Sequence, residues 1–103
     1  MQRDALSELT QWYTHHCNGE WEHHHGITVE TTDNPGWWVK IDVTGTELAR
    51  RAFPPILEGA DDGGFPIRPR WLCCRLQDTK WHGAGDDSRL SEIIGYFLAW
   101  AIS

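Results

Sequence analysis

The residues best suited to chemistry in this 103-residue chain lie between positions 15 and 25. They are five histidines, one cysteine and one glutamate: His15, His16, His23, His24, His25, Cys17 and Glu22. Imidazole and thiolate groups bind zinc well, so a small metal-dependent enzyme or ligand-binding domain built on this segment is one hypothesis. The spacing disfavours it, because no His-Glu-x-x-His motif occurs and, in a strand, His24 points away from its two neighbours. We therefore expect no metal and no cofactor.

Paired carboxylates are the second candidate for chemistry. Glu20 and Glu22 lie two residues apart, so on a strand they would share one face and could support acid–base catalysis. A solvated acidic face or a structural hydrogen-bond acceptor explains them better than catalysis does. Asp61-Asp62 and Asp86-Asp87 fall in glycine-rich stretches, where turn and capping roles suffice. No Gly-x-Ser-x-Gly motif occurs, and Gly83-Ala84-Gly85 lacks the lysine of a phosphate-binding loop. The sequence therefore predicts no enzyme.

The three cysteines indicate reduced thiols. Cys17 stands alone, at the end of a predicted helix, where the helix dipole disfavours a thiolate. Cys73 and Cys74 are adjacent and would project to opposite sides of a strand, which makes them a poor disulfide pair. The segment Met1 to Ala5 has no apolar signal core, and no apolar run approaches the roughly 20 residues that span a bilayer. We expect a cytoplasmic protein that does not bind membranes.

The charge balance favours a basic protein partner. Nine Lys and Arg residues against fifteen Asp and Glu residues give a formal net charge of −6. Such a field repels the phosphates of nucleic acids and anionic lipid surfaces, so neither is an expected partner. With 40% hydrophobic and 23% charged residues, the chain has the composition of one globular domain, which we assign to residues 1–103.

Apolar periodicity predicts a helix at each end of the chain. Residues 4–16 carry apolar side chains at three-four spacing, as an amphipathic helix does. A second helix should begin at an N-cap on Asp87 or Ser88 and bury a longer stripe: Leu90, Ile93, Ile94, Phe97, Leu98 and Ala101. Thr46 is positioned to cap a short helical segment over 47–52, and the proline-rich residues 53–70 read as a long loop.

Alternating patterns predict the strands. Residues 21–32 and 37–43 flank the turn sequence at 33–36 and form an antiparallel hairpin, in which Gly36 is expected to adopt a positive φ. Another strand covers 71–77, with Leu72, Cys74 and Leu76 on one face, and a short fourth strand begins at Trp81-His82. The predicted fold class is α+β: an antiparallel sheet of three to four strands with N- and C-terminal helices packed against it.

The seven tryptophans divide into two groups. Trp12, Trp37 and Trp100 lie on apolar faces and are expected in the core. Trp38 and Trp71 fall on the opposite faces of their strands. If only one face of the sheet is covered, both are exposed and resemble the aromatic anchors of protein interfaces. If the loop 53–70 covers the second face, they are buried, and the pattern alone leaves both alternatives open.

The chain resembles the immunity protein 53 family of bacterial polymorphic toxin systems. The resemblance is specific in the first half, at Gln11-Trp12-Tyr13, at Cys17 to His23, at Gly26-Ile27 and at Thr32 to Trp37 with the Val39-x-Ile41-Asp42 strand and Thr46. It is looser in the second half: Trp71, Cys74, Gly83, Gly85, Leu90, Phe97, Leu98 and Trp100. The stretch 53–70 and the His23-His24-His25 run depart from the family pattern.

This resemblance implies a small cytoplasmic antitoxin that binds and neutralises a cognate toxin domain and has no catalytic activity. It transfers no binding residues, so the candidate contacts are our own inference from charge and exposure. They are Glu20, Glu22 and Glu30 on the first strand, Trp38 on the second, Trp71, and the loop residues Asp61 and Asp62. Trp21 and the turn 33–36 are assigned to the scaffold. The toxin and the oligomeric state are left open.

Overall fold

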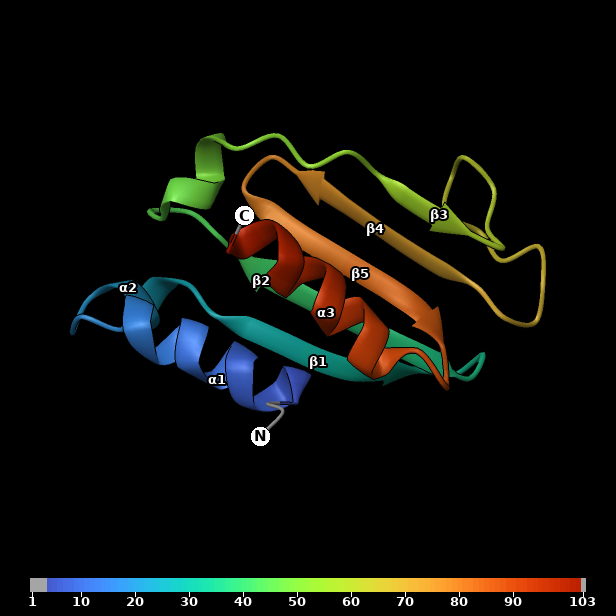
Figure 1. Cartoon of the computed structure of the whole chain (residues 1–103), viewed down its shortest axis with the longest axis horizontal. Helices are drawn as coiled ribbons and strands as arrows, with labels where there is room; N and C mark the ends of the chain where they lie inside the picture. Colours follow the sequence, from blue (N-terminus) through green and yellow to red (C-terminus); the bar gives the residue numbers. More distant parts are fainter. Residues whose placement is uncertain (1–3, 103) are drawn as a thin grey trace.

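A five-stranded antiparallel sheet with two long helices on one face forms the protein (Figure 1). The computed structural model describes residues 4–102. Most of the segment Met1 to Ala5, for which the sequence predicts no signal core, lies outside the described residues. In chain order the strands are β1 (Ile27–Thr32), β2 (Gly36–Asp42), β3 (Ile56–Glu58), β4 (Leu72–Gln77) and β5 (Lys80–Asp86). Their order across the sheet is β1-β2-β5-β4-β3. The predicted α+β class is confirmed, with one more strand than the upper estimate.

Helices α1 (Ala5–His16) and α3 (Leu90–Ala101) lie side by side over the same face (Figure 1). Asp4 caps α1, its carboxylate accepting the N–H of Ser7 at 2.7 Å. The rings of Trp12 and Phe97 meet edge to face, with centroids 5.0 Å apart, where the two helices touch. Both terminal helices are confirmed, although α3 begins after Arg89 rather than directly after Asp87 or Ser88.

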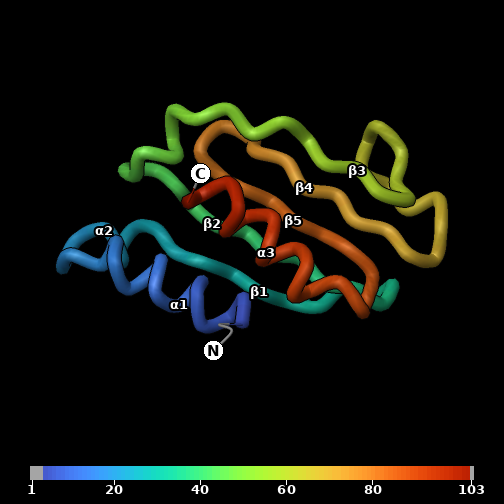
Figure 2. The backbone as a smooth tube through the Cα atoms, viewed as in Figure 1, coloured from blue at the N-terminus to red at the C-terminus, as the bar shows by residue number. Residues whose placement is uncertain are grey.

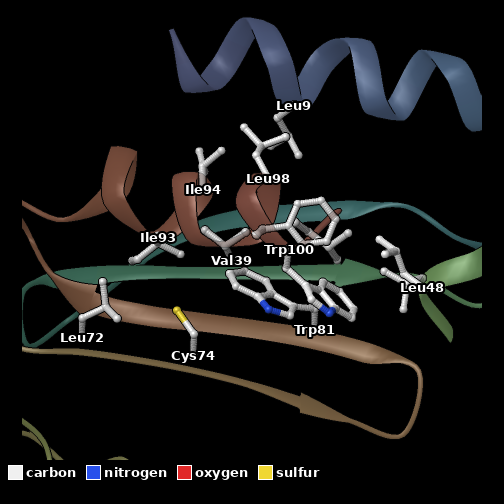
Figure 3. Packing of buried hydrophobic residues seen from close by; sticks show 13 residues of the cluster. Leu9, Val39, Leu48, Leu72, Cys74, Trp81, Ile93, Ile94, Leu98 and Trp100 are labelled. Carbon is white, nitrogen blue, oxygen red and sulfur yellow. The ribbon is translucent and has the colours of Figure 1, made fainter. Parts of the chain in front are cut away.

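The hydrophobic core lies between these helices and the sheet (Figure 3). Its centre is Trp81, fully buried on β5, with Val39 and Ile41 of β2 on one side and Leu72 and Cys74 of β4 on the other. Each strand contributes alternate residues, as the pleat requires. The stripe predicted on the last helix faces this core, and Trp100 is buried with it. Trp12 and Trp37 are partly buried against the core edge.

The predicted hairpin is confirmed, with a different role for its glycine. β1 and β2 pair from Ile27 with Ile41 to Thr32 with Gly36, which leaves residues 33–35 as the turn. Gly36 does not adopt a positive φ, so that prediction is wrong. A Cβ on Gly36 would lie 2.5 Å from the carbonyl oxygen of Gly85 on β5. The glycine is needed because two strands approach closely there, not because the backbone turns.

Three element boundaries differ from the sequence-based expectation. Residues 21–24 form a short helix, α2 (Trp21–His24), so the first strand begins only at Ile27. The fourth strand is long, because Gly83-Ala84-Gly85 lies inside β5 rather than after it. The loop 53–70 contains the edge strand β3, which pairs with β4. The short helix capped by Thr46 is confirmed as η1 (Glu47–Arg50).

The described helices are all short relative to a bilayer. None of those within residues 4–102 is both long and apolar enough to cross a membrane.

Candidate functional site

The histidine-rich segment does not form the predicted strand, because residues 21–24 are helical and β1 begins only at Ile27. His23 and His24 are exposed on α2, and His25 follows it as the C-cap. His16 closes α1, with its Nδ1 2.8 Å from the carbonyl oxygen of Trp12. Within residues 4–102, no group of three or more His, Cys, Asp or Glu side chains is placed to hold a metal ion. The histidines therefore take separate local roles at helix ends.

The cysteines are free thiols in different environments. Cys74 lies in the core, where burial raises the pKa of its thiol to about 12 and suppresses its nucleophilicity. Cys73 projects to the other face of the sheet, beneath the backbone of Gly64. Cys17 ends α1, with its Sγ 3.3 Å from the carbonyl oxygen of Tyr13. The adjacent pair does point to opposite sides, as the strand geometry predicts.

Glu20 and Glu22 do not share a strand face, because both lie at α2. Glu20 is the exposed N-cap position of this helix and makes no side-chain cap bond. The Glu22 carboxylate accepts the backbone N–H groups of Asn18 and Gly19 at 2.9 and 2.8 Å. Such backbone hydrogen bonds lower the pKa of Glu22. Glu22 thus holds the α1–α2 connection in shape, a role that the strand interpretation missed.

Asp42 is the best-connected carboxylate at this end of the sheet. Its Oδ2 lies 2.7 Å from His25 Nδ1 and 3.4 Å from Lys80 Nζ, and its Oδ1 accepts the N–H of Thr44 at 3.0 Å. Burial alone would raise the pKa of Asp42, but the hydrogen bonds from Thr44 and His25 outweigh it and lower that pKa to about 2. This network joins β2, β5 and the end of α2.

We expect this network to make stability pH-dependent in the acid range. Because the folded pKa of Asp42 lies below its ordinary value of 3.8, the stabilisation is complete above about pH 4 and is lost as the pH falls toward about 2. The Asp42→Asn variant should lose on the order of 1–2 kcal/mol at pH 7 and much less near pH 2.5. Urea unfolding at both pH values measures this. A difference that stays constant with pH would contradict the assignment, and Asp33→Asn in the exposed turn serves as the control.

The uncovered face of the sheet carries Trp38 and its neighbours. Trp38 is half-buried; its Nε1 donates to His82 Nδ1 at 3.3 Å, and the two rings are nearly parallel, 4° apart. The Nζ of Lys40 lies 5.8 Å from the Trp38 ring centroid. Glu30 of β1 pairs directly across from Trp38. Burial, together with Lys40, Arg75 and Lys80, lowers the pKa of His82. This surface is an aromatic patch with a cationic surround.

The loop 59–67 covers only part of the sheet face opposite the helices. It folds back at the far end of the sheet, as the tube in Figure 2 shows, and Ala60 bridges Pro66. Its Gly64 backbone lies over Cys73 and Arg75 of β4, and Trp38 of β2 is half-buried. Asp61 accepts the N–H groups of Gly63 and Phe65, each at 2.9 Å, so Asp61 shapes the loop, and Asp62 is exposed beside it.

Trp71 lies just before β4 and is half-buried. It lines a shallow pocket of 310 Å³ together with residues from the 33–36 turn and the proline-rich segment, among them Asn34 and Arg68. Its backbone N–H donates to Asp86 Oδ2 at 2.8 Å. Trp71 is therefore partly exposed, in the wall of this pocket.

The candidate contact residues do not gather into one site. The structure brings together Glu30 and Trp38 across a strand pair. Glu20 and Glu22 lie at the α2 end, whereas Asp61 and Asp62 lie on the loop at the other end of the molecule (Figure 1). A single flat interface touching all seven residues is therefore not what the fold presents.

The negative charge is concentrated in the first third of the chain. Residues 4–39 contain no Lys or Arg and carry six carboxylates: Asp4, Glu8, Glu20, Glu22, Glu30 and Asp33. Residues 40–103 are nearly balanced, with eight Lys and Arg against nine Asp and Glu. Because residues 4–39 form α1, α2, β1 and the start of β2, the field of the protein has one acidic side. This signal is readable in the sequence, but only when the charges are counted by segment.

The protein is thus a small α+β domain with an acidic first third of its chain. The model of the immunity protein 53 family matches residues 6–102, and the chain belongs to this family. No curated protein and no solved structure matches the chain significantly.

Proposed function

We propose that this protein is an antitoxin of the bacterial cytoplasm that neutralises a cognate toxin domain by stoichiometric association, without catalysis. The match of the immunity protein 53 family to residues 6–102 carries this proposal. Because the match extends over nearly the whole chain, the antitoxin role belongs to the whole domain rather than to an appended motif. The structure adds surfaces suited to protein contact: an exposed acidic side, and aromatic side chains on the uncovered face.

A basic toxin fits the charge distribution best. No Lys or Arg separates the six carboxylates of residues 4–39 along the sequence. An opposite charge on the toxin would steer the two proteins together and speed their association. Rapid association suits an antitoxin, because a toxin acts before inhibition is complete.

Among the candidate contacts, Glu30 and Trp38 form the most favourable pair. They are adjacent on the sheet, Glu30 is exposed, and its carboxylate makes none of the structural hydrogen bonds that occupy Glu22. Glu20 extends the same acidic side. Asp61, Asp62 and Trp71 are proposed as a second, separate contact region around the loop 59–67, where Phe65 and Ile67 are also exposed.

The test is co-expression with the toxin domain encoded beside this gene, followed by co-purification. We expect growth rescue and an equimolar complex whose association slows as the salt concentration rises. The Glu30→Lys variant should associate about tenfold more slowly. The Glu47→Lys variant, which makes the same charge change at an exposed position outside residues 4–39, should stay close to wild type. A folded toxin that neither binds nor is neutralised would overturn the proposal.

A further inference from the structure

A groove separates helix α1 from strand β1. α1 packs on α3 through Leu9 and Trp12, which leaves a space beside the strand. This groove has a volume of about 460 Å³ and is lined mainly by apolar and aromatic side chains: Leu6, Leu9, Thr10, Tyr13, Glu22, His25, Gly26, Ile27 and Val29. Leu6 is 63% exposed and Val29 is 42% exposed, one on each wall. Apolar side chains thus face solvent from both sides of a channel.

The strand that forms one wall has a free edge. β1 pairs only with β2 among the described strands. The bond from the N–H of Asp42 to the carbonyl oxygen of Gly26 fixes the phase of the ladder. Since hydrogen-bonded and non-hydrogen-bonded pairs alternate, the backbone N–H and C=O groups of Ile27, Val29 and Thr31 point to the outer edge. Unpaired backbone groups therefore line the same groove as the apolar side chains.

Apart from the charge of Glu30, this edge lacks the features that prevent strands from pairing with other chains. Edge strands are commonly protected by Lys, by Pro or by a bulge. β1 has the sequence Ile-Thr-Val-Glu-Thr-Thr, in which every residue except Glu30 is β-branched, and it pairs with β2 in continuous register. Such a strand is well suited to accept another strand along its edge.

The charges around the groove select the occupant. Among the described residues that line the groove, Glu22 is the one carboxylate and none is a Lys or Arg, and neither α1 nor β1 contains a Lys or Arg. We propose that an extended, basic segment of the toxin adds to β1 as a sixth strand and places apolar side chains between Leu6 and Val29. The proposal rests on the proposed antitoxin function and specifies how the toxin is held.

Two lysine substitutions on β1 test this mode of binding. Val29→Lys puts a charge into the groove, and Thr32→Lys makes a matched charge change on the same strand but on the opposite face. Both positions are exposed, so both variants should fold. With the purified toxin domain, we expect Val29→Lys to weaken binding about 30-fold or more and Thr32→Lys to weaken it only a few-fold, through the general charge.

Hydrogen exchange of the wild-type complex provides a second readout that needs no variant. The amides of Ile27, Val29 and Thr31 should exchange fast in the free protein and become protected when the toxin binds. Two results together would overturn the proposal while leaving the antitoxin function intact: these amides stay unprotected in the complex, and the Val29→Lys variant binds the toxin as tightly as the wild type does. Protection that grows with the concentration of the free protein alone would identify a second copy as the occupant and would equally overturn it. Absence of any wild-type complex would overturn both proposals.

Discussion

Replacing Trp81 with alanine should lower the free energy of unfolding by about 3–5 kcal/mol, which removes most of the stability of a domain this small. Trp81 is fully buried on the central strand β5, and its ring meets Phe97 and Phe53 edge to face, with centroids 5.3 and 5.8 Å away. Figure 3 shows it among the core side chains on the side of the sheet that α3 covers. Chemical denaturation of the purified variant measures the loss, and protection against the toxin should disappear with the fold.

The Trp81→Phe variant distinguishes the contribution of side-chain volume to stability from that of the indole N–H. Among residues 4–102, Trp81 Nε1 is one of two buried side-chain nitrogens without a hydrogen-bond partner. Phenylalanine removes that unsatisfied donor and keeps one aromatic ring, so its cost should be about 1–2 kcal/mol. Equal losses for Trp81→Ala and Trp81→Phe would contradict packing as the source of the stability.

The elements that were predicted correctly carry their own signals within a few residues. α1 and α3 follow from apolar spacing, and Asp4 caps α1 through a bond to Ser7 three residues away. The β1–β2 hairpin follows from alternation around a turn-forming sequence, and β4 presents Leu72 and Cys74 to the core as its alternation predicts. In these cases the local pattern and the tertiary contacts favour the same structure.

The elements that were missed depend on partners far away in the chain. Gly83-Ala84-Gly85 reads locally as a loop, yet it forms the middle of β5, because a Cβ on Gly83 would lie 2.4 Å from Ile93 Cγ2 of α3. The glycines let a helix pack close to the sheet, and no neighbour in sequence reveals that. The first strand was predicted to begin at residue 21, but residues 21–24 form α2, and Trp21 is held by its Nε1 donating to the carbonyl oxygen of Thr44 at 2.8 Å.

The candidate site could be predicted in kind but not in position. Net acidity indicates a binding protein, and family membership agrees with that. Which residues lie together was beyond the sequence: Glu30 and Trp38 meet only through the strand register, and Glu22 proves to be a structural acceptor. The groove beside β1 depends on the position of α1, which is set by contacts with α3 such as that of Trp12 with Phe97, far away in the sequence.

Arg89 connects the elements at the other end of the sheet. It is 8% exposed and lies just before α3. Its guanidinium donates to Glu58 of β3 and, at 2.6 Å, to Glu92 of α3, and its Nε lies 3.8 Å from Asp86 Oδ2 at the end of β5. Tyr96 also donates to Glu58, at 2.6 Å, and hydrogen bonds from Tyr96 and Arg89 lower the pKa of Glu58.

The Arg89→Ala variant should lose about 3 kcal/mol of stability, because removing the cation leaves two partly buried carboxylates, Glu58 and Asp86, without their counter-charge. The substitution should lower the free energy of unfolding of the whole domain and should also increase local opening near Glu58. Glu58 ends β3 and directly precedes the loop 59–67, so hydrogen exchange should rise first in β3 and in that loop, before it rises in β1 and β2. Urea unfolding and exchange rates measure the two effects.

A double-mutant cycle with Glu58→Gln isolates the ion pair from the packing of the arginine stem. If the charges interact as the geometry indicates, the double variant should be more stable than the sum of the two single losses implies, by about 1 kcal/mol or more. Arg50→Ala, at an exposed position on η1, should change stability by less than about 0.5 kcal/mol and controls for a general effect of charge. Additive losses, with no early exchange in the loop, would show that Arg89 does not anchor β3. In that case the hydrogen bonds that Asp61 accepts within the loop would be what positions Asp61 and Asp62.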